Sequence, residues 1–362
     1  LGNRIEAPAE AMVIDARGRI VTPGLVDMHS HLGVYPWPHA KAHADGNELT
    51  GPTMPMVRAI DGFDPEDPAI ARALVGGVTT ALILPGSGNI MGGEALHVKL
   101  RGKTVAEMQI PRAPRALKMA MGENPKRVYG KKSRTPMSRL GHGWLMRQQF
   151  FKARRLMRQQ DQWERSAVRH KPRPFDAALE PLVALLRGDV WLQVHCYEVH
   201  DIETLLRVAR EFRFRVAAIH HALEAWKVPK ILRDNDVTVA LFSDLWGYKL
   251  EAYDGSVHAP KLLHAAGVKV AIKSDHPVLD ARDLVFEAAK ARHYGLGEQA
   301  ALASITRIPA MAIGMAKRIG TLETGKDADV VLWSQHPFTI GARPAKVWVE
   351  GVLVVDAERR KP

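Results

Sequence analysis

Histidine and aspartate recur at the ends of short apolar stretches in this chain of 362 residues. The stretch LVDMHSHLG places His29 and His31 one residue apart behind an apolar run. Three later stretches, WLQVH, VAAIHH and VAIKSD, end in further residues of the same kinds, which are His195, His220, His221 and Asp275. Imidazole and carboxylate are suitable ligands for zinc, iron and manganese. One histidine at a strand end is more often structural than metal-binding, but four such ends together predict a metal site.

These residues can meet only if the apolar stretches are strands that end at the same edge of a sheet. Strand-like composition is found at 25–31, 76–86, 115–124, 189–197, 214–221, 236–244 and 267–275, with amphipathic helical patterns between most of these stretches. The alternation predicts βαβ units and a parallel sheet. Seven or eight such strands favour an α/β fold of the closed (β/α)8 barrel type, with residues 95–102 as the leading candidate for the remaining strand. In such a barrel, functional residues converge at the carboxyl ends of the strands, and the two-residue period of a strand directs His29 and His31 to one side.

Both ends of the chain differ in character from this pattern. Residues 12–22 are typical of two short strands around a turn at Arg17 and Gly18, and the tail from Gly320 is β-rich and hairpin-like. We therefore predict a small β-sandwich domain built from residues 1–22 and 318–362. The barrel then occupies residues 23–317.

The net charge of +12 comes from one segment of the chain. Between Arg112 and Arg173 there are 18 lysines and arginines and three acidic residues, which gives this segment a net charge of +15. The rest of the chain carries a net charge of −3. We interpret this segment as a solvated, basic helical excursion around residues 125–173, with an anionic substrate as the functional alternative. A nucleic-acid partner is disfavoured, because no zinc knuckle, RNP-like aromatic signature or heptad-extended basic region accompanies the charge. No window has the length and apolar composition of a membrane span, and the single Cys196 excludes an internal disulfide.

The order of His-x-His, Lys, His, His and Asp along the predicted strands resembles the amidohydrolase superfamily of metal-dependent hydrolases. The stretch GRIVTPGLVDMHSHLG is similar to the opening motif of that superfamily, and IGTLETGKDADVVLW is similar to its closing motif. The resemblance covers nearly the whole chain, and these bracketing motifs are far more specific than His-x-His alone. The stretches ALILPGSGNIMGGE, LKMAMGENPKRVYG and KSDHPV are similar to the imidazolonepropionase-like branch, which includes prolidase-type enzymes that act on dipeptides.

The resemblance implies a role for each candidate ligand. His29 and His31 would bind the more buried metal ion, and His195 and His221 the more exposed one. His221 is favoured over His220, because the branch usually has this ligand directly before a small residue, here Ala222. His220 is then a packed residue beside the ligands, and the choice between the two histidines stays open.

Lys118, in ALKMAMG, lies where many relatives carry a carboxylated lysine that bridges two metal ions. An ammonium group has no lone pair to offer a metal, whereas its carbamate is an anion with two oxygens. Glu123 is the alternative bridging acid, and an unmodified Lys118 is a further alternative. We expect a divalent cofactor, above all zinc, with two ions if Lys118 is carboxylated and one ion otherwise.

Asp275 would bind metal weakly and also serve as the catalytic general base and acid. A divalent metal lowers the pKa of bound water toward neutrality, and the hydroxide would attack a carbonyl carbon. Asp275 would accept the proton of that water and pass it to the leaving amine. Arg127 and Tyr129, in NPKRVYG, are candidate contacts to a substrate carboxylate, since a planar guanidinium suits bidentate pairing.

The sequence therefore predicts a metal-dependent hydrolase that cleaves the C–N amide bond of a dipeptide, an N-acyl amino acid or a cyclic amide. One alternative is a deaminase of a heterocycle on the same fold, which an unmodified Lys118 and a single metal would favour. The other is a non-catalytic binding barrel, which the complete set of ligands disfavours. We expect a small-molecule substrate, no nucleic-acid or membrane partner, and a homo-oligomer. Localisation is left open: a cytoplasmic protein is favoured, with a leader upstream of Leu1 as the alternative.

Overall fold

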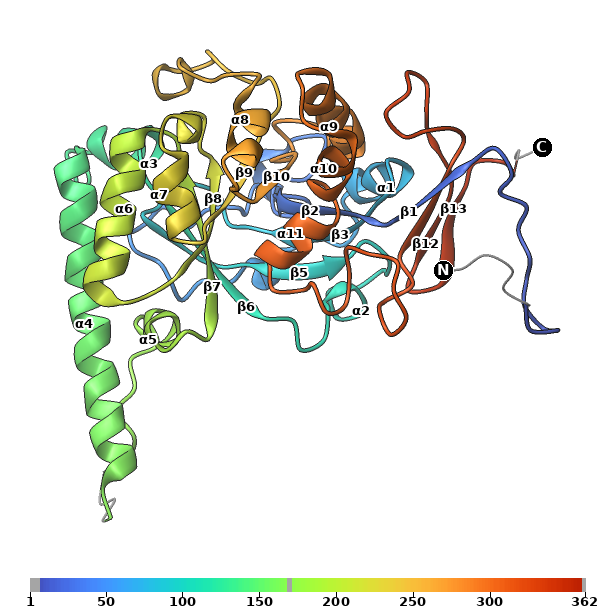
Figure 1. Cartoon of the computed structure of the whole chain (residues 1–362). Coiled ribbons are helices and arrows are strands. Elements are labelled where there is room, and N and C mark those ends of the chain that lie inside the picture. The colour runs from blue at the N-terminus through green and yellow to red at the C-terminus, as the bar shows by residue number, and fades with distance from the viewer. Residues whose placement is uncertain (1–6, 168–170, 360–362) are drawn as a thin grey trace.

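The computed structural model describes residues 7–167 and 171–359, a mixed α/β structure in which helices pack around parallel strands (Figure 1). Its largest sheet has six strands in the order β10-β9-β8-β7-β6-β4. These strands are β4 (Met91–Glu94), β6 (Arg115–Ala120), β7 (Val190–Cys196), β8 (Val216–His221), β9 (Thr238–Leu241) and β10 (Val270–Ile272). Strands β6 to β10 run parallel to one another, and β4 is antiparallel to β6. Nearly all their residues are buried, which is typical of parallel strands covered on both faces.

A second, three-stranded sheet has the order β2-β3-β5. Its strands are β2 (Leu25–Ser30), β3 (Val78–Ile83) and β5 (Leu96–Lys99). The two sheets meet at both edges. At one edge Ser30 forms a parallel bridge with His276, and the Asp275 N–H donates to the His29 carbonyl at 2.9 Å. At the other edge the segment 91–99 supplies β4 to the larger sheet and β5 to the smaller one.

The strands differ from the predicted barrel in two respects. They are divided between two sheets instead of forming one continuous ring, and the segment predicted at 95–102 contains β5, which runs antiparallel to β3. The local cause lies at Gly93, which adopts φ +121 and whose Cβ would lie 2.5 Å from the Val57 carbonyl oxygen. Only glycine tolerates both conditions. It allows the register shift between Met91 and Gly93 in the pairing of β4 with β6, two residues before the chain passes to β5 of the other sheet.

Helices follow most of the parallel strands, as the alternating pattern predicts. They are α1 (Pro68–Val75), α2 (Val105–Met108), α3 (Glu123–Gly130), α4 (Arg139–Arg165), α5 (Glu180–Arg187), α6 (Val199–Phe212), α7 (Pro229–Asp234), α8 (Ala259–Ala265), α9 (Leu284–His293), α10 (Glu298–Ala303) and α11 (Arg307–Ala312). Short 3-10 turns lie at Lys41–His43, Ala59–Asp61, Ala225–Lys227, Leu250–Ala252 and Ala281–Asp283. Local sequence sets the start of α1, where Asp67 accepts the Ala69 N–H at 2.9 Å and Pro68 occupies the first turn. Over residues 7–167 and 171–359, no helix combines the length and the apolar composition needed to cross a bilayer.

Within the described residues, the basic segment contains the helices α3 and α4, whereas its residues 168–170 lie outside the described residues, and the predicted strand 115–124 is only partly a strand. Strand β6 ends at Ala120, and α3 begins at Glu123. Helix α4, green in Figure 1, extends beyond the sheets at one side of the molecule. It buries an apolar face made of Leu145, Met146, Phe150, Ala153 and Leu156. The opposite face carries exposed basic residues such as Lys152, Arg155 and Arg158.

A third sheet joins strands from both ends of the chain, as predicted. Its order is β1-β11-β12-β13, with β1 (Ile20–Pro23), β11 (Val330–Trp333), β12 (Pro344–Val349) and β13 (Val352–Asp356), and all neighbours are antiparallel (Figure 1). It is a single sheet and not the predicted sandwich of two. The first strand expected within 12–22 is absent from the described residues, since Met12 and Val13 are exposed and 11–16 has no regular structure.

A buried ion cluster connects this third sheet to β2 and β3. The Lys99 Nζ lies 2.5 Å from Asp329 Oδ2 and 2.9 Å from Asp327 Oδ2. The Asp329 carboxylate also accepts the Thr79 hydroxyl at 3.2 Å, and the Asp329 carbonyl accepts the Gly24 N–H at 2.9 Å. These contacts fix the point at which β2 begins. They therefore help to set the position of the two histidines at its other end.

Helix α4 also buries His142 completely, and this generates a test of the packing. Neither ring nitrogen of His142 forms a hydrogen bond with the described residues. Burial, with the nearby charges of Arg139 and Lys126, lowers the pKa of His142 to about 3. The unfolded chain takes up this proton below its ordinary pKa of about 6.5, whereas the folded chain does not. Stability should therefore fall as the pH drops from about 6.5 toward 3, by up to about 1.4 kcal/mol per pH unit from this group.

We predict that His142→Leu reduces the slope of unfolding free energy against pH between pH 6.5 and 4, measured by urea unfolding. The matched control is His293→Leu, which removes an exposed histidine from α9 and should leave the slope unchanged. Parallel slopes for the wild type and His142→Leu would show that His142 is not held neutral by its surroundings.

Candidate active site

Asp275, at the start of the loop after β10, brings together side chains from several strands. Its Oδ1 lies 3.0 Å from His29 Nε2 and 3.2 Å from His31 Nε2. Its Oδ2 lies 3.4 Å from Lys273 Nζ and 3.6 Å from His221 Nδ1. Burial opposes ionisation of this carboxyl, but the Lys273 ammonium and the surrounding imidazoles hold the pKa of Asp275 well below its usual range. The buried group at the centre of the site is therefore a carboxylate.

Strand β2 places His29 and His31 on the same side of the sheet. The His31 Nδ1 lies 2.7 Å from the Leu84 carbonyl oxygen, which can only accept, so this nitrogen carries the proton and Nε2 has a free lone pair. The His29 Nδ1 is occupied by His220 at 2.8 Å, which leaves His29 Nε2 to face Asp275. Burial lowers the pKa of His29 well below its ordinary value, so this ring is neutral.

The donor set at this point fits a divalent cation. One ligand atom from each of His29, His31 and Asp275 lies within 4.8 Å of the others. The unprotonated His31 Nε2 and a carboxylate oxygen 3.2 Å away would repel each other without a positive charge between or beside them. Atoms bound to one zinc ion at about 2.0–2.2 Å lie about 3 Å apart, in keeping with these separations.

His195 and His221 form a second group of donors beside the first. Their ring centroids are 4.4 Å apart, and Tyr197 stacks on His221 at 4.9 Å. Both nitrogens of His195 and the Nε2 of His221 are buried without a hydrogen bond to the described residues. Burial lowers the pKa of both histidines well below the ordinary value. Buried polar atoms are normally satisfied, so these orphaned nitrogens also fit a metal.

The two neighbouring histidines at the end of β8 differ in what their nitrogens contact. Both ring nitrogens of His220 form hydrogen bonds. Its Nδ1 lies 2.8 Å from His29 Nδ1, and its Nε2 lies 2.8 Å from Gln193 Oε1. His221 keeps Nε2 free of hydrogen bonds to the described residues. This arrangement favours His221 over His220 as a ligand.

The two candidate bridging residues lie in different surroundings. The Lys118 side chain is fully buried, with Nζ 3.3 Å from His29 Nε2 and 3.1 Å from the Pro85 carbonyl oxygen. Burial lowers the pKa of Lys118 to about 8. Glu123, in contrast, is partly exposed at the start of α3 and lies 3.8 Å from Arg127 in an ion pair. Lys118 is thus the candidate that reaches the histidines.

Lys273 is a site residue that the sequence analysis missed. It is fully buried, with Nζ 2.8 Å from His221 Nδ1 and 3.1 Å from the centroid of the Phe242 ring. Burial lowers the pKa of Lys273 to about 7. A signal was available in VAIKSD, because Lys273 lies two residues before Asp275 and strand residues two apart share a face.

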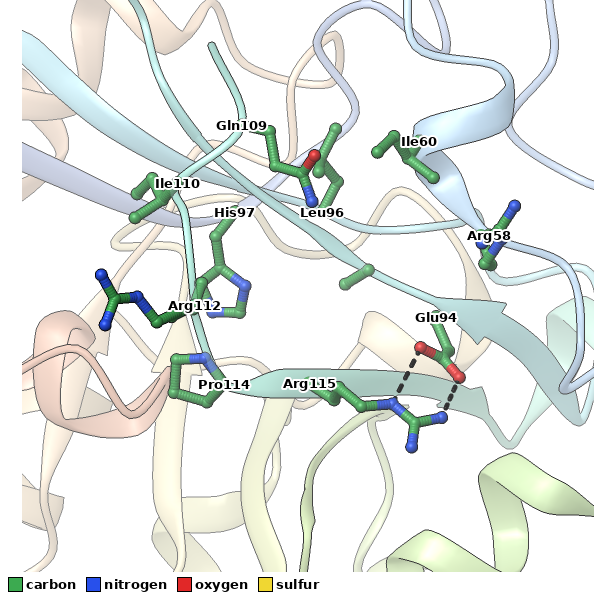
Figure 2. A pocket seen from close by; sticks show the side chains of 12 residues that line it. Arg58, Ile60, Glu94, Leu96, His97, Gln109, Ile110, Arg112, Pro114 and Arg115 are labelled. Atoms are coloured by element: carbon green, nitrogen blue, oxygen red, sulfur yellow. Dashed lines mark hydrogen bonds and ion pairs between the residues drawn. The ribbon is translucent and has the colours of Figure 1, made fainter. Parts of the chain in front are cut away.

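A cavity of about 580 Å³ opens above these residues. His31, His195 and Asp275 lie in its wall. Arg127, a predicted substrate contact, also lines it, together with Lys249, whose Nζ lies 4.0 Å from the centroid of the Tyr197 ring. Lys249 gave no signal in the sequence, since a single lysine in a loop is ordinary. A second cavity, drawn in Figure 2, lies at the amino end of β6, where Arg115 pairs with Glu94; none of the predicted ligands lines it.

Tyr129 lies outside the cavity wall, in contrast to its predicted contact with substrate. Its side chain is buried, and its hydroxyl donates to the Gly51 carbonyl at 2.6 Å and accepts from Asn89 Nδ2 at 3.0 Å. The residue thereby connects α3 to the loop after β2. Arg127 and Tyr129 are two residues apart in α3, about 200° around the helix axis, so their side chains point to different sides of the helix.

We predict that Tyr129→Phe lowers the free energy of unfolding by about 0.5–1.5 kcal/mol, because the substitution removes the hydroxyl that donates to the Gly51 carbonyl and accepts from Asn89 Nδ2. Chemical denaturation measures this change. Tyr253→Phe, which alters an exposed tyrosine, is the matched control and should have no effect. An unchanged stability with a raised KM would instead support the direct contact with substrate that the sequence predicted.

Comparisons with known proteins identify the family of this chain. The sequence model of the Amidohydrolase family matches residues 182–354. Amidohydrolase tasK of Hapsidospora irregularis is 41% identical over 371 residues; the match covers 97% of this chain, which spans only 38% of that protein's length. The crystal structure of an amidohydrolase from Thermotoga maritima MSB8 is 38% identical, with a TM-score of 0.93 over 98% of this chain and 92% of that one. A prolidase complexed with N-methylphosphonate-L-proline shares the fold, with 18% identity and a TM-score of 0.58 over 97% of this chain and 90% of that one. The chain belongs to the amidohydrolase family of hydrolases.

Proposed function

We propose that this chain is a metal-dependent hydrolase that cleaves the C–N bond of an amide, in a dipeptide, an N-acyl amino acid or a cyclic amide. The observation that carries the proposal is the convergence of His29, His31 and Asp275 at one point, where His31 and Asp275 line an open cavity. Membership of the amidohydrolase family supports it.

We also infer that the two inner sheets are two arcs of one (β/α)8 barrel over residues 23–317. The bridge between Ser30 and His276 and the shared segment 91–99 support this inference, because they join the sheets at both edges. Residues 1–22 and 318–362 then form the second, smaller domain. This arrangement would place the ligands at the carboxyl ends of the strands, where barrel enzymes have their active sites.

The proposed ligands fall into two groups. His29, His31 and Asp275 would hold one divalent ion, and His195 and His221 would hold a second. Zinc suits a set of imidazoles and one carboxylate. When bound, such ions would polarise the substrate carbonyl and lower the pKa of water.

The side chains supply the proton transfers and the binding of substrate. Asp275, held ionised by its neighbours, would accept a proton from the attacking water and deliver it to the leaving nitrogen. Arg127 gives the cavity wall positive charge, which suits a substrate with a carboxylate, and Lys249 lines the same wall while paired with Glu251 at 2.6 Å. Tyr197 and Tyr248 share a hydrogen bond at 2.5 Å and line the same wall with aromatic surface.

The test combines metal analysis with a substrate panel. We expect the native protein to contain divalent metal by plasma mass spectrometry and to hydrolyse at least one member of a panel of dipeptides, N-acyl amino acids and cyclic amides. Asp275→Asn should lower kcat at least a hundredfold, because it removes the general base. The control is Asp244→Asn, which alters a carboxylate paired with Lys290 at 2.6 Å outside the cavity wall. A folded protein that neither retains nor takes up metal would overturn the proposal, and release of ammonia from heterocycles would favour a deaminase.

We further propose that Lys118 is carboxylated and bridges two ions. A buried amine whose pKa is about 8 has a substantial neutral fraction near pH 7.5. Its nitrogen can attack carbon dioxide and lose a proton, giving a carbamate whose single negative charge is shared by two oxygens beside His29.

We predict a carbamate resonance in the ¹³C NMR spectrum of wild-type protein exchanged with ¹³C-labelled bicarbonate. The Lys118→Arg variant should lack this resonance and should bind one equivalent of metal fewer. The matched control is Lys273→Arg, since Lys273 is the other buried amine of the site, and it should retain the resonance. If the resonance disappears only in Lys273→Arg, the modified residue is Lys273. If it is absent from the wild type, the bridge is not a carbamate.

A further inference from the structure

We propose that Gln193 and His220 form a hydrogen-bonded relay that fixes the tautomer of His29 and so directs its Nε2 lone pair at the metal position. The inference rests on the proposed metal site. It assigns a positioning role to two residues that are not ligands.

The relay is a chain of groups that starts at the main chain and ends at the metal position. Gln193 Nε2 lies 3.1 Å from the Ala312 carbonyl oxygen. Gln193 Oε1 lies 2.8 Å from His220 Nε2, and His220 Nδ1 lies 2.8 Å from His29 Nδ1. The far nitrogen of His29 then lies 3.0 Å from Asp275 Oδ1. Strands β7, β8 and β2 each contribute one member.

The first group in this chain sets the direction of every hydrogen bond that follows. The Ala312 carbonyl can only accept, so the amide nitrogen of Gln193 faces it and the amide oxygen faces His220. The reverse orientation of the amide would place two carbonyl oxygens 3.1 Å apart. His220 Nε2 therefore donates, and its Nδ1, in a neutral ring, accepts. His29 Nδ1 must then donate, which leaves the lone pair on Nε2.

Burial makes this relay necessary. The side chains of His29, Gln193 and His220 are all fully inaccessible to solvent, so water does not stand in for a missing partner. His31 needs no relay, because the Leu84 carbonyl accepts its Nδ1 proton directly. Adjacent residues of β8 thus have different roles, with His220 orienting a ligand and His221 as a proposed ligand. Partners behind metal-binding histidines commonly fix the tautomer and strengthen binding.

The test uses Co²⁺ as the probe on the full chain after removal of metal. Gln193→Met keeps the size of the side chain but removes the acceptor, so we expect the tightest Co²⁺ affinity to fall about 10- to 100-fold. Gln193→Glu keeps an acceptor toward His220, and burial beside the Ala312 carbonyl favours a protonated carboxyl that donates to that carbonyl, so this variant should restore affinity to within about threefold. Gln160→Met removes an equally buried amide from α4 and should have no effect. Equal affinity of Gln193→Met and wild type would overturn the relay, as would an equal loss in Gln193→Met and Gln193→Glu.

A second measurement uses only the wild-type protein. In wild-type protein labelled with ¹⁵N-histidine, in the presence of Zn²⁺, we expect the proton of His29 on Nδ1 and that of His220 on Nε2, with a coupling across the hydrogen bond between the two Nδ1 atoms. The opposite tautomers would overturn the relay even if the wild type binds Co²⁺. A wild type that binds no divalent ion but shows the expected tautomers would overturn the proposed function and leave the hydrogen-bond directions established.

Discussion

A buried carboxylate must be compensated by nearby positive charge or hydrogen-bond donors, and this requirement at Asp275 governs the centre of the molecule. The ammonium of Lys273 supplies positive charge 3.4 Å from one of its oxygens, and imidazoles from two strands surround the carboxylate. The backbone of Asp275 adopts φ +57, a left-handed conformation that is uncommon outside glycine. Such a conformation persists only where the surroundings enforce it. The hydrogen bond from the Asp275 N–H to the His29 carbonyl is part of that enforcement.

The strand that carries the first histidines is held by polar contacts at both of its ends. At its start, the ion cluster of Lys99, Asp327 and Asp329 connects it to the terminal sheet. Near its other end, the buried Asp27 carboxylate accepts the Ser274 hydroxyl and, at 3.3 Å, the Ser274 N–H. Removing one partner from a buried pair leaves an uncompensated charge and is far more costly than removing both. The terminal sheet therefore contributes to the active site by fixing the position of β2, although it supplies no residue to the cavity wall.

The walls of the site and its deepest residues have different kinds of chemistry. The deepest residues are neutral imidazoles, buried amines and one carboxylate, whose protonation states depend on exclusion from water. The upper wall has Arg127 and Lys249, which remain able to meet solvent or a charged ligand. Under the proposed function, this separation would let charge at the opening recognise the substrate, while protons would move among groups that are excluded from water.

The sequence by itself determined the ligand types at the strand ends, the alternation of strands and helices, and the sheet made from both chain ends. These features depend on spacing along a single segment or on the polarity of its neighbours, which the sequence displays directly. Only the tertiary structure decided that 91–99 runs antiparallel and that Tyr129 faces Gly51. It alone also placed Lys273 against His221 and separated the contacts of His220 from those of His221. Each of these outcomes depends on which atoms from distant segments become buried together. Residue type alone does not decide whether a polar side chain binds a ligand, positions a neighbouring side chain or only packs in the core; its buried surroundings do.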